Sequence, residues 1–311
     1  MKEHTLTTDE LIDKADRLEE TGDLTEALHY WRLAVDREAD PVALCRLANI
    51  AMELGIEEEA ERAFVSAIEL SPNFPNAHNM LGLLYHERGD LEGALGCFLR
   101  SAEIEENIRT LTFLGTVELQ LGMTNSARES LTKAVMLDPN HEEAHYNLGL
   151  TYSTEAPPEA VNSFRAALKL APQYAMAHRE LGWALARLGQ YADAEKHIRE
   201  AIELDESDGW AYIYLGNLLS MRGVPRGAEQ ALIKASEVCP DSSVPSWSLA
   251  IFYEYENRPH EAAFFYENAL HFNPDDPQLN LRFGRFLREI GEAEKAEPFL
   301  ELARSFMRGS R

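Results

Sequence analysis

The sequence has few cysteines, no long apolar segment and no basic, apolar leader. Its three cysteines, Cys45, Cys97 and Cys239, lie far apart, and an odd number does not make a disulfide framework. No apolar run approaches the ~20 residues that a membrane-spanning helix needs. The first residues are rich in carboxylates, so we expect no secretory signal. These features favour a cytoplasmic protein in a reducing compartment.

Basic residues are also scarce. There are 29 Lys and Arg against 53 Asp and Glu, which gives a formal net charge of −24. Such a field repels phosphate backbones and anionic lipids, so we expect neither a nucleic acid nor a membrane as a partner. The hydrophobic content of 45% and charged content of 26% are those of a folded protein.

Motifs of common catalytic sites are missing. We find no glycine-rich phosphate loop, no nucleophile elbow and no Cys/His cluster. The string His-Glu-Glu-Ala-His at residues 141–145 matches a zinc-protease pattern, but Pro139 and Asn140 precede it. A turn is therefore expected there, whereas this zinc chemistry needs both histidines on one helical face. We expect no enzyme, no cofactor and no metal.

What the sequence does have is an internal repeat of 33 or 34 residues. Alanine recurs at this interval at Ala27, Ala60, Ala94, Ala127, Ala160, Ala194, Ala228, Ala262 and Ala296. A bulky residue follows each alanine at Trp31, Phe64, Phe98, Leu131, Phe164, Ile198, Leu232, Tyr266 and Leu300. Apolar positions spaced i, i+3, i+4 and i+7 predict two amphipathic helices and a turn in each unit. Internal repeats of this kind determine the fold class.

Glycines occupy two positions of the repeat. Those expected in the middle of first helices are Gly82, Gly115, Gly149, Gly182, Gly216 and Gly284. A glycine inside a helix lowers its stability by about 1 kcal/mol relative to alanine. We therefore predict that the paired helices approach closely at these glycines, because such packing would offset the loss. Those expected to end first helices are Gly22, Gly55, Gly89, Gly122, Gly189, Gly223 and Gly291. A left-handed residue at a helix end costs glycine little.

The strings Leu81-Gly82-x-x-Tyr85 and Ala94-x-x-x-Phe98 resemble the tetratricopeptide repeat. The resemblance implies an all-α, right-handed superhelical solenoid of nine tandem helix-turn-helix repeats. It also implies a concave groove lined by the first helices. A protein–protein interaction scaffold or adaptor that binds a peptide or helical segment of a partner protein is the function that follows from it.

The repeats are expected to form a single solenoid over residues 8–305. They begin near residues 8, 41, 75, 108, 142, 175, 209, 243 and 277, with terminal tails at 1–7 and 306–311. The fifth repeat is one residue short at 155–158, which should distort its turn.

A second stripe of the first helices lies nearly opposite their packing stripe, at about 100° per residue. In repeats four to eight it is rich in rings and amides rather than charges. Its candidate partner-binding residues are Phe113, Tyr146, Asn147, Arg179, Trp183, Trp210, Tyr214, Asn217, Trp247 and Tyr255. Exposed aromatic residues with neighbouring amides are typical of peptide-binding surfaces. The alternative is that these rings fill gaps between adjacent first helices.

The last repeat carries Arg282, Arg285 and Arg288 on the same side. They are candidates for contact with a carboxylate or an acidic segment, because guanidinium groups bind carboxylates bidentately. The alternative is an ordinary exposed terminal face.

A different class of function is self-assembly by end-to-end stacking into a homo-oligomeric structural scaffold. Residues 1–72 hold 18 acidic and 7 basic residues, whereas residues 277–311 hold 5 acidic and 7 basic ones. Opposite ends of unlike charge, and apolar residues such as Phe299 in the final helix, would favour that contact.

Overall fold

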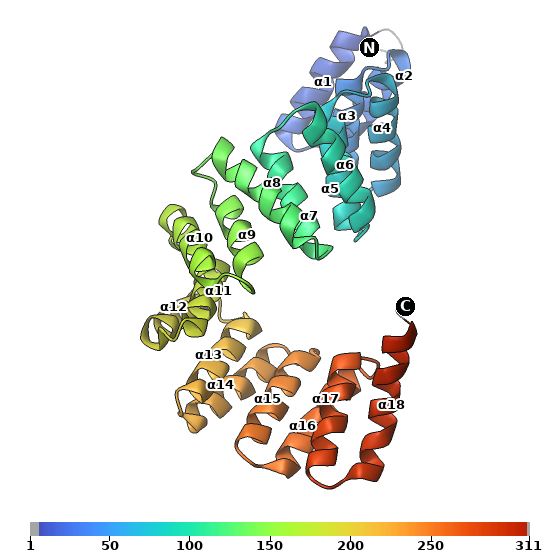
Figure 1. Cartoon of the computed structure of the whole chain (residues 1–311). Helices are drawn as coiled ribbons and strands as arrows, with labels where there is room; N and C mark the ends of the chain where they lie inside the picture. Colours follow the sequence, from blue (N-terminus) through green and yellow to red (C-terminus); the bar gives the residue numbers. More distant parts are fainter. Residues whose placement is uncertain (1–5, 310–311) are drawn as a thin grey trace. The chain divides into compact units, whose positions relative to one another are not determined.

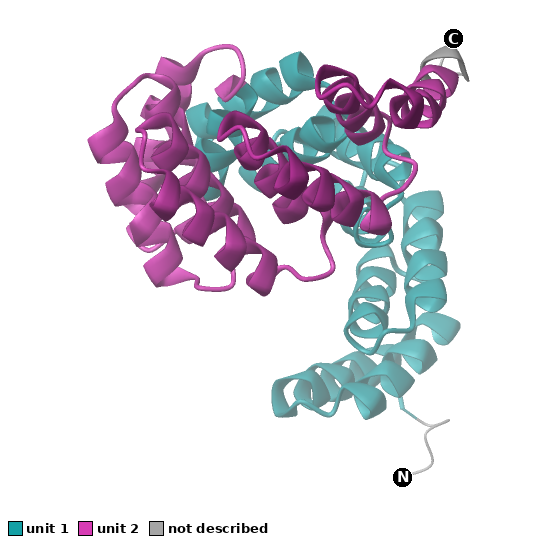
Figure 2. Ribbon diagram, turned by 90° about the horizontal axis from the view of Figure 1, so that it is seen from below, with its two compact units in different colours: residues 1–151 teal, residues 152–311 magenta. Residues whose placement is uncertain are grey.

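The fold consists of paired α-helices. In this computed structural model, which describes residues 6–309, eighteen helices and no strand are found among the described residues (Figure 1). The chain divides into two compact units, Met1–Thr151 and Tyr152–Arg311 (Figure 2). The predicted all-α helical-repeat fold is confirmed.

The helices of the two units are similar in length. The first unit contains α1 (Thr8–Thr21), α2 (Leu24–Arg37), α3 (Pro41–Glu53), α4 (Glu57–Leu70), α5 (Pro75–Glu87), α6 (Leu91–Ile104), α7 (Ile108–Gln120), α8 (Thr124–Leu137) and α9 (Glu142–Tyr152), whose last residue opens the second unit. The second unit contains α10 (Pro157–Leu170), α11 (Ala175–Arg187), α12 (Tyr191–Leu204), α13 (Gly209–Met221), α14 (Pro225–Val238), α15 (Ser243–Tyr255), α16 (Pro259–Phe272), α17 (Pro277–Glu289) and α18 (Ala293–Gly309).

Odd-numbered helices are the first helices of the repeats, and even-numbered helices are the second helices. The odd-numbered helices begin at residues 8, 41, 75, 108, 142, 175, 209, 243 and 277, where the sequence places the repeat starts. Within each unit a first helix packs against the second helix that follows it, as α11 does against α12. First helices of adjacent repeats also touch, as α11 and α13 do, and α13 and α15. Neighbouring first helices therefore share one side of each unit.

The mid-helix glycines lie where paired helices come closest. A Cβ added at Gly216 would lie 2.6 Å from Cγ of Leu232 and 3.2 Å from the carbonyl oxygen of Ala228. The same crowding by the partner helix occurs at Gly82, Gly115, Gly182 and Gly284. The close approach predicted from the mid-helix glycines is confirmed at these five positions.

The turns inside the repeats use left-handed residues. The stop glycines have φ between 71° and 87°, namely Gly22, Gly55, Gly89, Gly122, Gly189, Gly223 and Gly291. This conformation is free of steric cost only for glycine, so the prediction from the sequence is confirmed. In the eighth repeat the position is filled by Asn257, at φ 55°.

Replacing Asn257 with glycine is expected to raise the free energy of unfolding by about 0.5 kcal/mol, because the left-handed strain of a side chain is removed. Replacement with alanine is expected to lower it by about 1 kcal/mol, since alanine tolerates that conformation less well than asparagine. Urea unfolding of the three chains measures both changes. A loss of stability with glycine would show that the side chain, not the backbone angle, matters here.

The turn of the fifth repeat departs from the others, as expected from its missing residue. Helix α9 has 11 residues, whereas α7 and α11 have 13. Arg187 of α11 donates hydrogen bonds to the carbonyl oxygens of Ser153 and Thr154, the latter at 2.8 Å. A side chain thus satisfies backbone groups in this turn.

The C-terminal helix is longer than the sequence predicts. Helix α18 continues to Gly309, so the tail expected from residue 306 is corrected: residues 306–309 are helical, because no glycine or proline occurs between Pro298, which the helix accommodates, and Gly309. Residues 1–5 and 310–311 of the expected tails lie outside the described residues. The ring of Phe299 packs on Phe283 of α17, with centroids 4.8 Å apart. This ring, considered for end-to-end contact, is used inside the last repeat.

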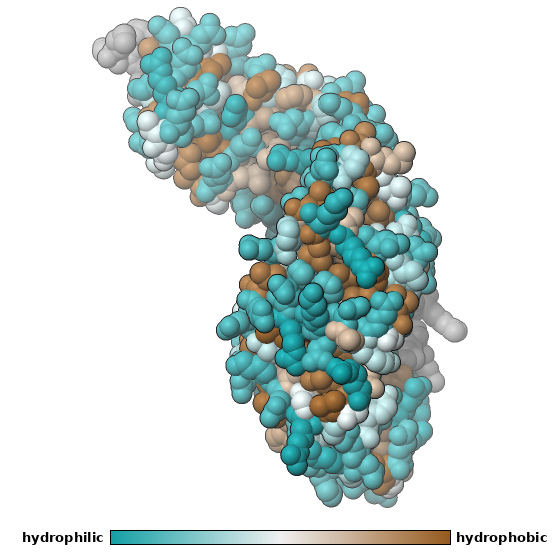
Figure 3. Space-filling view, turned by 90° about the vertical axis from the view of Figure 1, so that its left-hand side faces the viewer, coloured by the Kyte–Doolittle hydropathy of each residue, from teal (hydrophilic) through white to brown (hydrophobic). Residues whose placement is uncertain are grey.

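The surface is mixed in character. Hydrophilic residues predominate on the face drawn in Figure 3, and hydrophobic residues form scattered groups there. Over residues 6–309, none of the helices has the length and apolar character that crossing a bilayer requires.

Candidate functional site

An aromatic cluster joins two first helices of the second unit. Trp183 of α11 stacks on Tyr214 of α13, with ring centroids 4.8 Å apart and planes 19° from parallel. Trp210, one turn before Tyr214, meets the same ring edge-on at 6.1 Å. Trp183 and Tyr214 are half-buried, whereas Trp210 remains 48% exposed. The structure therefore brings three of the predicted rings together and leaves one of them largely open to solvent.

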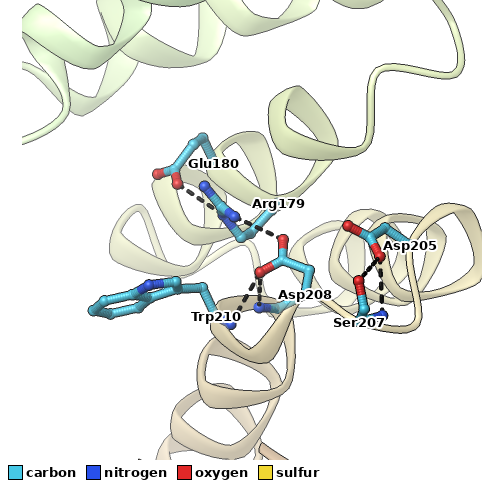
Figure 4. Close-up of polar contacts among 7 residues, drawn as sticks. Arg179, Glu180, Asp205, Ser207, Asp208 and Trp210 are labelled. Carbon is cyan, nitrogen blue, oxygen red and sulfur yellow. Dashed lines mark hydrogen bonds and ion pairs between the residues drawn. The ribbon is translucent and has the colours of Figure 1, made fainter. Parts of the chain in front are cut away.

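Arg179 lies beside this cluster but is already paired. Its Nε donates to Oε1 of Glu180 at 3.0 Å, and its Nη1 donates to Oδ2 of Asp208 at 2.6 Å (Figure 4). The other oxygen of Asp208 accepts the backbone N–H groups of Trp210 and Ala211 at 3.0 and 3.3 Å. Asp208 therefore caps α13 and ties the start of that helix to α11.

This ion cluster is poorly hydrated. Only 15% of the Arg179 side chain, 11% of Glu180 and 9% of Asp208 is exposed. Burial acts to lower the pKa of Arg179, but the charges of Glu180 and Asp208 outweigh it and raise that pKa. Burial raises the pKa of Glu180, and Arg179 offsets only part of that rise. Arg179 thus acts as a structural counter-ion that positions α13 and its rings.

Burial also raises the pKa of the Tyr214 phenol, and the charge of Glu180 adds to the effect. The phenol hydrogen-bonds to the Glu180 carboxylate. The aromatic cluster and the ion cluster are therefore physically connected through one hydroxyl group.

A pocket lies further along the same side, between α13 and α15. Its volume is about 530 Å³, and it is lined by Asn217, Ser220, Met221, Ser248, Ile251, Phe252, Tyr255 and Glu256. Two predicted residues, Asn217 and Tyr255, meet in this pocket, and Tyr255 is 76% exposed. Apolar walls with a few amide and hydroxyl groups are typical of ligand pockets.

Trp247 of α15 is half-buried. Its indole Nε1 is sealed from solvent and has no hydrogen-bond partner among the described residues. A buried indole N–H usually donates a hydrogen bond. The N–H of Trp247 is therefore an unsatisfied donor on α15, the helix that also lines the pocket.

The predicted residues of the first unit are used internally. Phe113 stacks on Phe98 of the preceding second helix at 5.7 Å. Asn147 is 6% exposed and its Nδ2 donates to Oγ1 of Thr116 at 3.0 Å. Tyr146 is 7% exposed. Asn147 thus joins the adjacent first helices α9 and α7, whereas the Phe113 ring packs on a second helix and not in a gap between first helices.

The three arginines of the last repeat differ in their contacts. Arg282 donates to Oε1 of Glu254 at 2.8 Å, and Arg288 donates to Oε2 of Glu297 at 2.7 Å. Arg285 is exposed and makes no hydrogen bond or ion pair within residues 6–309. An acidic ligand would therefore meet Arg285 without first breaking an internal pair.

The histidines of the zinc-like string bond to backbone groups. Nδ1 of His141 accepts the N–H of Ala144 at 3.2 Å, and Nε2 of His145 hydrogen-bonds to the carbonyl oxygen of Pro139 at 3.0 Å. His178 makes the same contact with the carbonyl oxygen six residues upstream, also at 3.0 Å. This position of the repeat is structural.

Sequence reasoning missed part of the pocket lining and both partners of Arg179. Met221 stands five residues after Gly216, the offset at which Tyr255 follows Ala250, so the repeat register could have identified it. Asp208 directly precedes a repeat start, where a capping residue is expected.

Stacked helix pairs at a 33- to 34-residue interval define a helical-repeat protein. Models described as tetratricopeptide repeat match residues 12–73 and 152–209, residues 63–96 and residues 108–141. The chain belongs to the tetratricopeptide repeat family.

Relatives of this chain are diverse. TPR repeat-containing protein YpiA of Bacillus subtilis is 24% identical over 230 residues, 72% of this chain and 53% of the relative. Superkiller protein 3 of Schizosaccharomyces pombe is 27% identical over 230 residues, 68% of this chain and 16% of the relative. Protein O-mannosyl-transferase TMTC3 of Homo sapiens is 24% identical over 281 residues, 83% of this chain and 31% of the relative. The chain thus spans about half or less of these relatives.

Solved structures with the same fold include a tetratricopeptide repeat protein from Parabacteroides merdae, with a TM-score of 0.65 at 18% identity, covering 85% of this chain and 98% of that one. Another is YrrB, with a TM-score of 0.52 at 24% identity, covering 58% of this chain and 95% of that one. At these identities the likeness shows the fold alone.

Proposed function

We propose that this chain is a non-catalytic scaffold or adaptor that binds a peptide or helical segment of a partner protein. The binding face comprises the aromatic cluster of Trp183, Trp210 and Tyr214 together with the α13–α15 pocket. Tetratricopeptide repeat proteins generally mediate protein–protein interactions, and YrrB is described as a TPR protein with an unusual peptide-binding site. The single observation that carries the proposal is the pocket of about 530 Å³ on the helix that also presents Trp210.

The chemistry of this face suits a polypeptide. Covering exposed rings such as Trp210 and Tyr255 with a partner side chain makes the free energy of binding more favourable. Anchors of this kind contribute about 2 kcal/mol each to binding. The amide of Asn217 and the hydroxyls of Ser220 and Ser248 can bond to peptide groups at the same time. The Nε1–H group of Trp247 has no acceptor, and a small movement of its side chain would let it donate to a peptide carbonyl oxygen.

A catalytic role is not proposed, because the charged groups beside the rings are paired with one another. Arg179 pairs with both Glu180 and Asp208, and Asp208 caps α13. The name of TMTC3 describes a transferase, but the name belongs to that longer protein, of which this chain covers 31%.

The test is selection of peptides from a phage-displayed random library on the whole chain, followed by fluorescence anisotropy of the selected peptides. Trp210→Ala combined with Tyr255→Ala is expected to weaken binding by at least about 100-fold, because two anchors are removed. Phe264→Ala is the matched control, since Phe264 is a 57% exposed ring on the second helix α16. It should leave the affinity unchanged. Equal binding by all three folded chains would overturn the proposed face.

A further inference from the structure

A carboxyl group is buried in the first unit at a position that other repeats fill with apolar or phenolic side chains. Glu118 of α7 stands three residues after Gly115 and is 4% exposed. The corresponding residues elsewhere include Leu18, Ala51, Tyr85, Leu185, Leu219, Tyr253 and Leu287. Burial of a carboxyl is expensive unless hydrogen bonds or a counter-ion compensate it. The contacts of Glu118 therefore need an explanation.

Those contacts are incomplete. Ser130 of α8 hydrogen-bonds to the carboxyl group, but Oε2 is sealed from solvent and has no hydrogen-bond partner. No cation pairs with Glu118 in the part of the chain that the structure describes. Burial raises the pKa of Glu118, and the charge of Glu129 raises it further. One oxygen thus lacks a donor.

The carboxyl group lines a pocket of about 320 Å³ between the second helices α6 and α8. Its buried lining includes the apolar side chains of Leu111 and Leu114 of α7, beside Glu118. Glu103, Glu106 and Glu129 lie at its exposed rim. The lining includes Lys133, which already pairs with Glu106 at 2.9 Å. Glu103 is likewise paired, with Arg100 of α6 at 3.0 Å. Four carboxyl groups against these two paired cations still give the pocket an excess of negative charge.

We propose that this α6–α8 pocket binds an alkylguanidinium group, the chemistry of an arginine side chain, with its head at the carboxyl group of Glu118, which turns toward the ligand so that Oε2 gains a donor. The apolar walls fit the alkyl stem, and the acidic rim attracts the cation. A guanidinium suits the buried end better than an ammonium, because it is more weakly hydrated and presents several donors in a fixed plane. Pockets for small ligands have volumes from about 300 Å³ upward, and the volume of this pocket lies near that lower limit. The residues 6–309 contain no group of three His, Cys, Asp or Glu side chains placed to hold a metal ion.

This site is independent of the proposed binding face, since it lies in the first unit and opens between the second helices α6 and α8, with α7 behind them. The guanidinium could belong to an arginine of a partner protein or to a free small molecule. Both sources share the same head group, so one set of probes tests the site and distinguishes the source.

The test is titration of the whole chain with butylguanidinium, followed by NMR. Binding is expected for the natural chain, with butylammonium weaker, and Glu118→Gln should weaken binding of butylguanidinium at least about tenfold. Glu92→Gln is the matched control, since Glu92 is an exposed glutamate of α6 outside the pocket. It should bind as the natural chain does. No binding by the natural chain, or unchanged binding by Glu118→Gln, would overturn the site.

A second measurement needs no variant. Binding should weaken as pH falls through the pKa of Glu118, at a higher pH than for an ordinary carboxyl, because the protonated form no longer attracts a cation. The other charged groups of the pocket lining are Glu103 on α6, Glu106 just after that helix, and Glu129 and Lys133 on α8, and Arg100 of α6 pairs with Glu103. Binding that does not change over this range would contradict the assignment. A capped glycyl-arginyl-glycine peptide then identifies the source: tighter binding than butylguanidinium indicates a protein arginine, and weaker binding a free small molecule.

Discussion

Replacing Gly182 with alanine is expected to lower the free energy of unfolding by about 2–3 kcal/mol, although alanine is the better helix former. An added Cβ would lie 2.6 Å from Cγ1 of Ile198, 3.0 Å from the carbonyl oxygen of Ala194 and 3.1 Å from the backbone nitrogen of Ile198. Two of these three atoms belong to the backbone, which cannot rotate away from the added Cβ as a side chain can. Helices α11 and α12 must therefore separate, with loss of packing along their whole interface. Urea unfolding followed by circular dichroism measures the change.

The same substitution at Gly96 serves as the control. Gly96 lies in the interior of α6, it is exposed, and no atom lies within 4 Å of an added Cβ. Alanine is expected to raise the free energy of unfolding there by about 0.5–1 kcal/mol, the ordinary helix-propensity gain. Opposite signs from one chemical change would establish close packing as the reason for the mid-helix glycine. A stabilised Gly182→Ala chain would show that the helices have room to spare.

The repeat period was enough to predict the fold because it is fixed by backbone requirements. Helix pairs need a residue such as Gly182 where backbones touch, and turns need a residue such as Gly89 where φ is positive. Few residue types satisfy either condition, so the positions are visible in the sequence. Even the exception is informative: Asn257 is the residue that best replaces glycine in the left-handed region.

The candidate site was predicted less well, because a position on a helix face does not determine where a long side chain ends. Arg179 lies on the predicted stripe, but its guanidinium reaches the cap residue Asp208 of the next repeat. Phe113 lies on the corresponding stripe in the first unit, but its ring meets Phe98. Such contacts depend on side-chain rotamers and on the side chains of the neighbouring repeat. The repeat pattern gives only the position of each residue along its helix.

The α6–α8 pocket also shows what the sequence can and cannot predict about a site. The repeat register places Glu118 among buried residues, so a charge in the core could be noticed in the sequence. Whether that charge has a counter-ion depends on the reach of Lys133, which pairs with Glu106 instead. The unmet oxygen is therefore a property of the structure alone.

Replacing Arg179 with methionine is expected to lower the free energy of unfolding by about 3–5 kcal/mol, because it leaves two buried carboxylates without their cation. Methionine keeps much of the side-chain volume, so the loss reports the charge rather than a cavity. Glu180 and Asp208 would then repel one another with only 11% and 9% of their side chains exposed. Thermal and urea unfolding of the whole chain measure the effect. The start of α13, which Asp208 caps, should loosen, and Trp210 with it.

The pH dependence separates this electrostatic cause from simple loss of packing. Burial already raises the pKa of Glu180, and Arg179 is the group that restrains the rise, so the variant raises it further. A folded-state pKa above the unfolded value means that stability is present at low pH and is lost as pH rises through the folded pKa. The deficit of Arg179→Met should therefore be largest near neutrality and shrink as pH falls toward the ordinary glutamate value of 4.5. Arg199→Met removes an arginine that is 54% exposed from an i,i+4 pair with Glu195, and it should cost less than about 0.5 kcal/mol. A deficit at position 179 that is equally small, or independent of pH, would show that the cluster does not hold α13 in place.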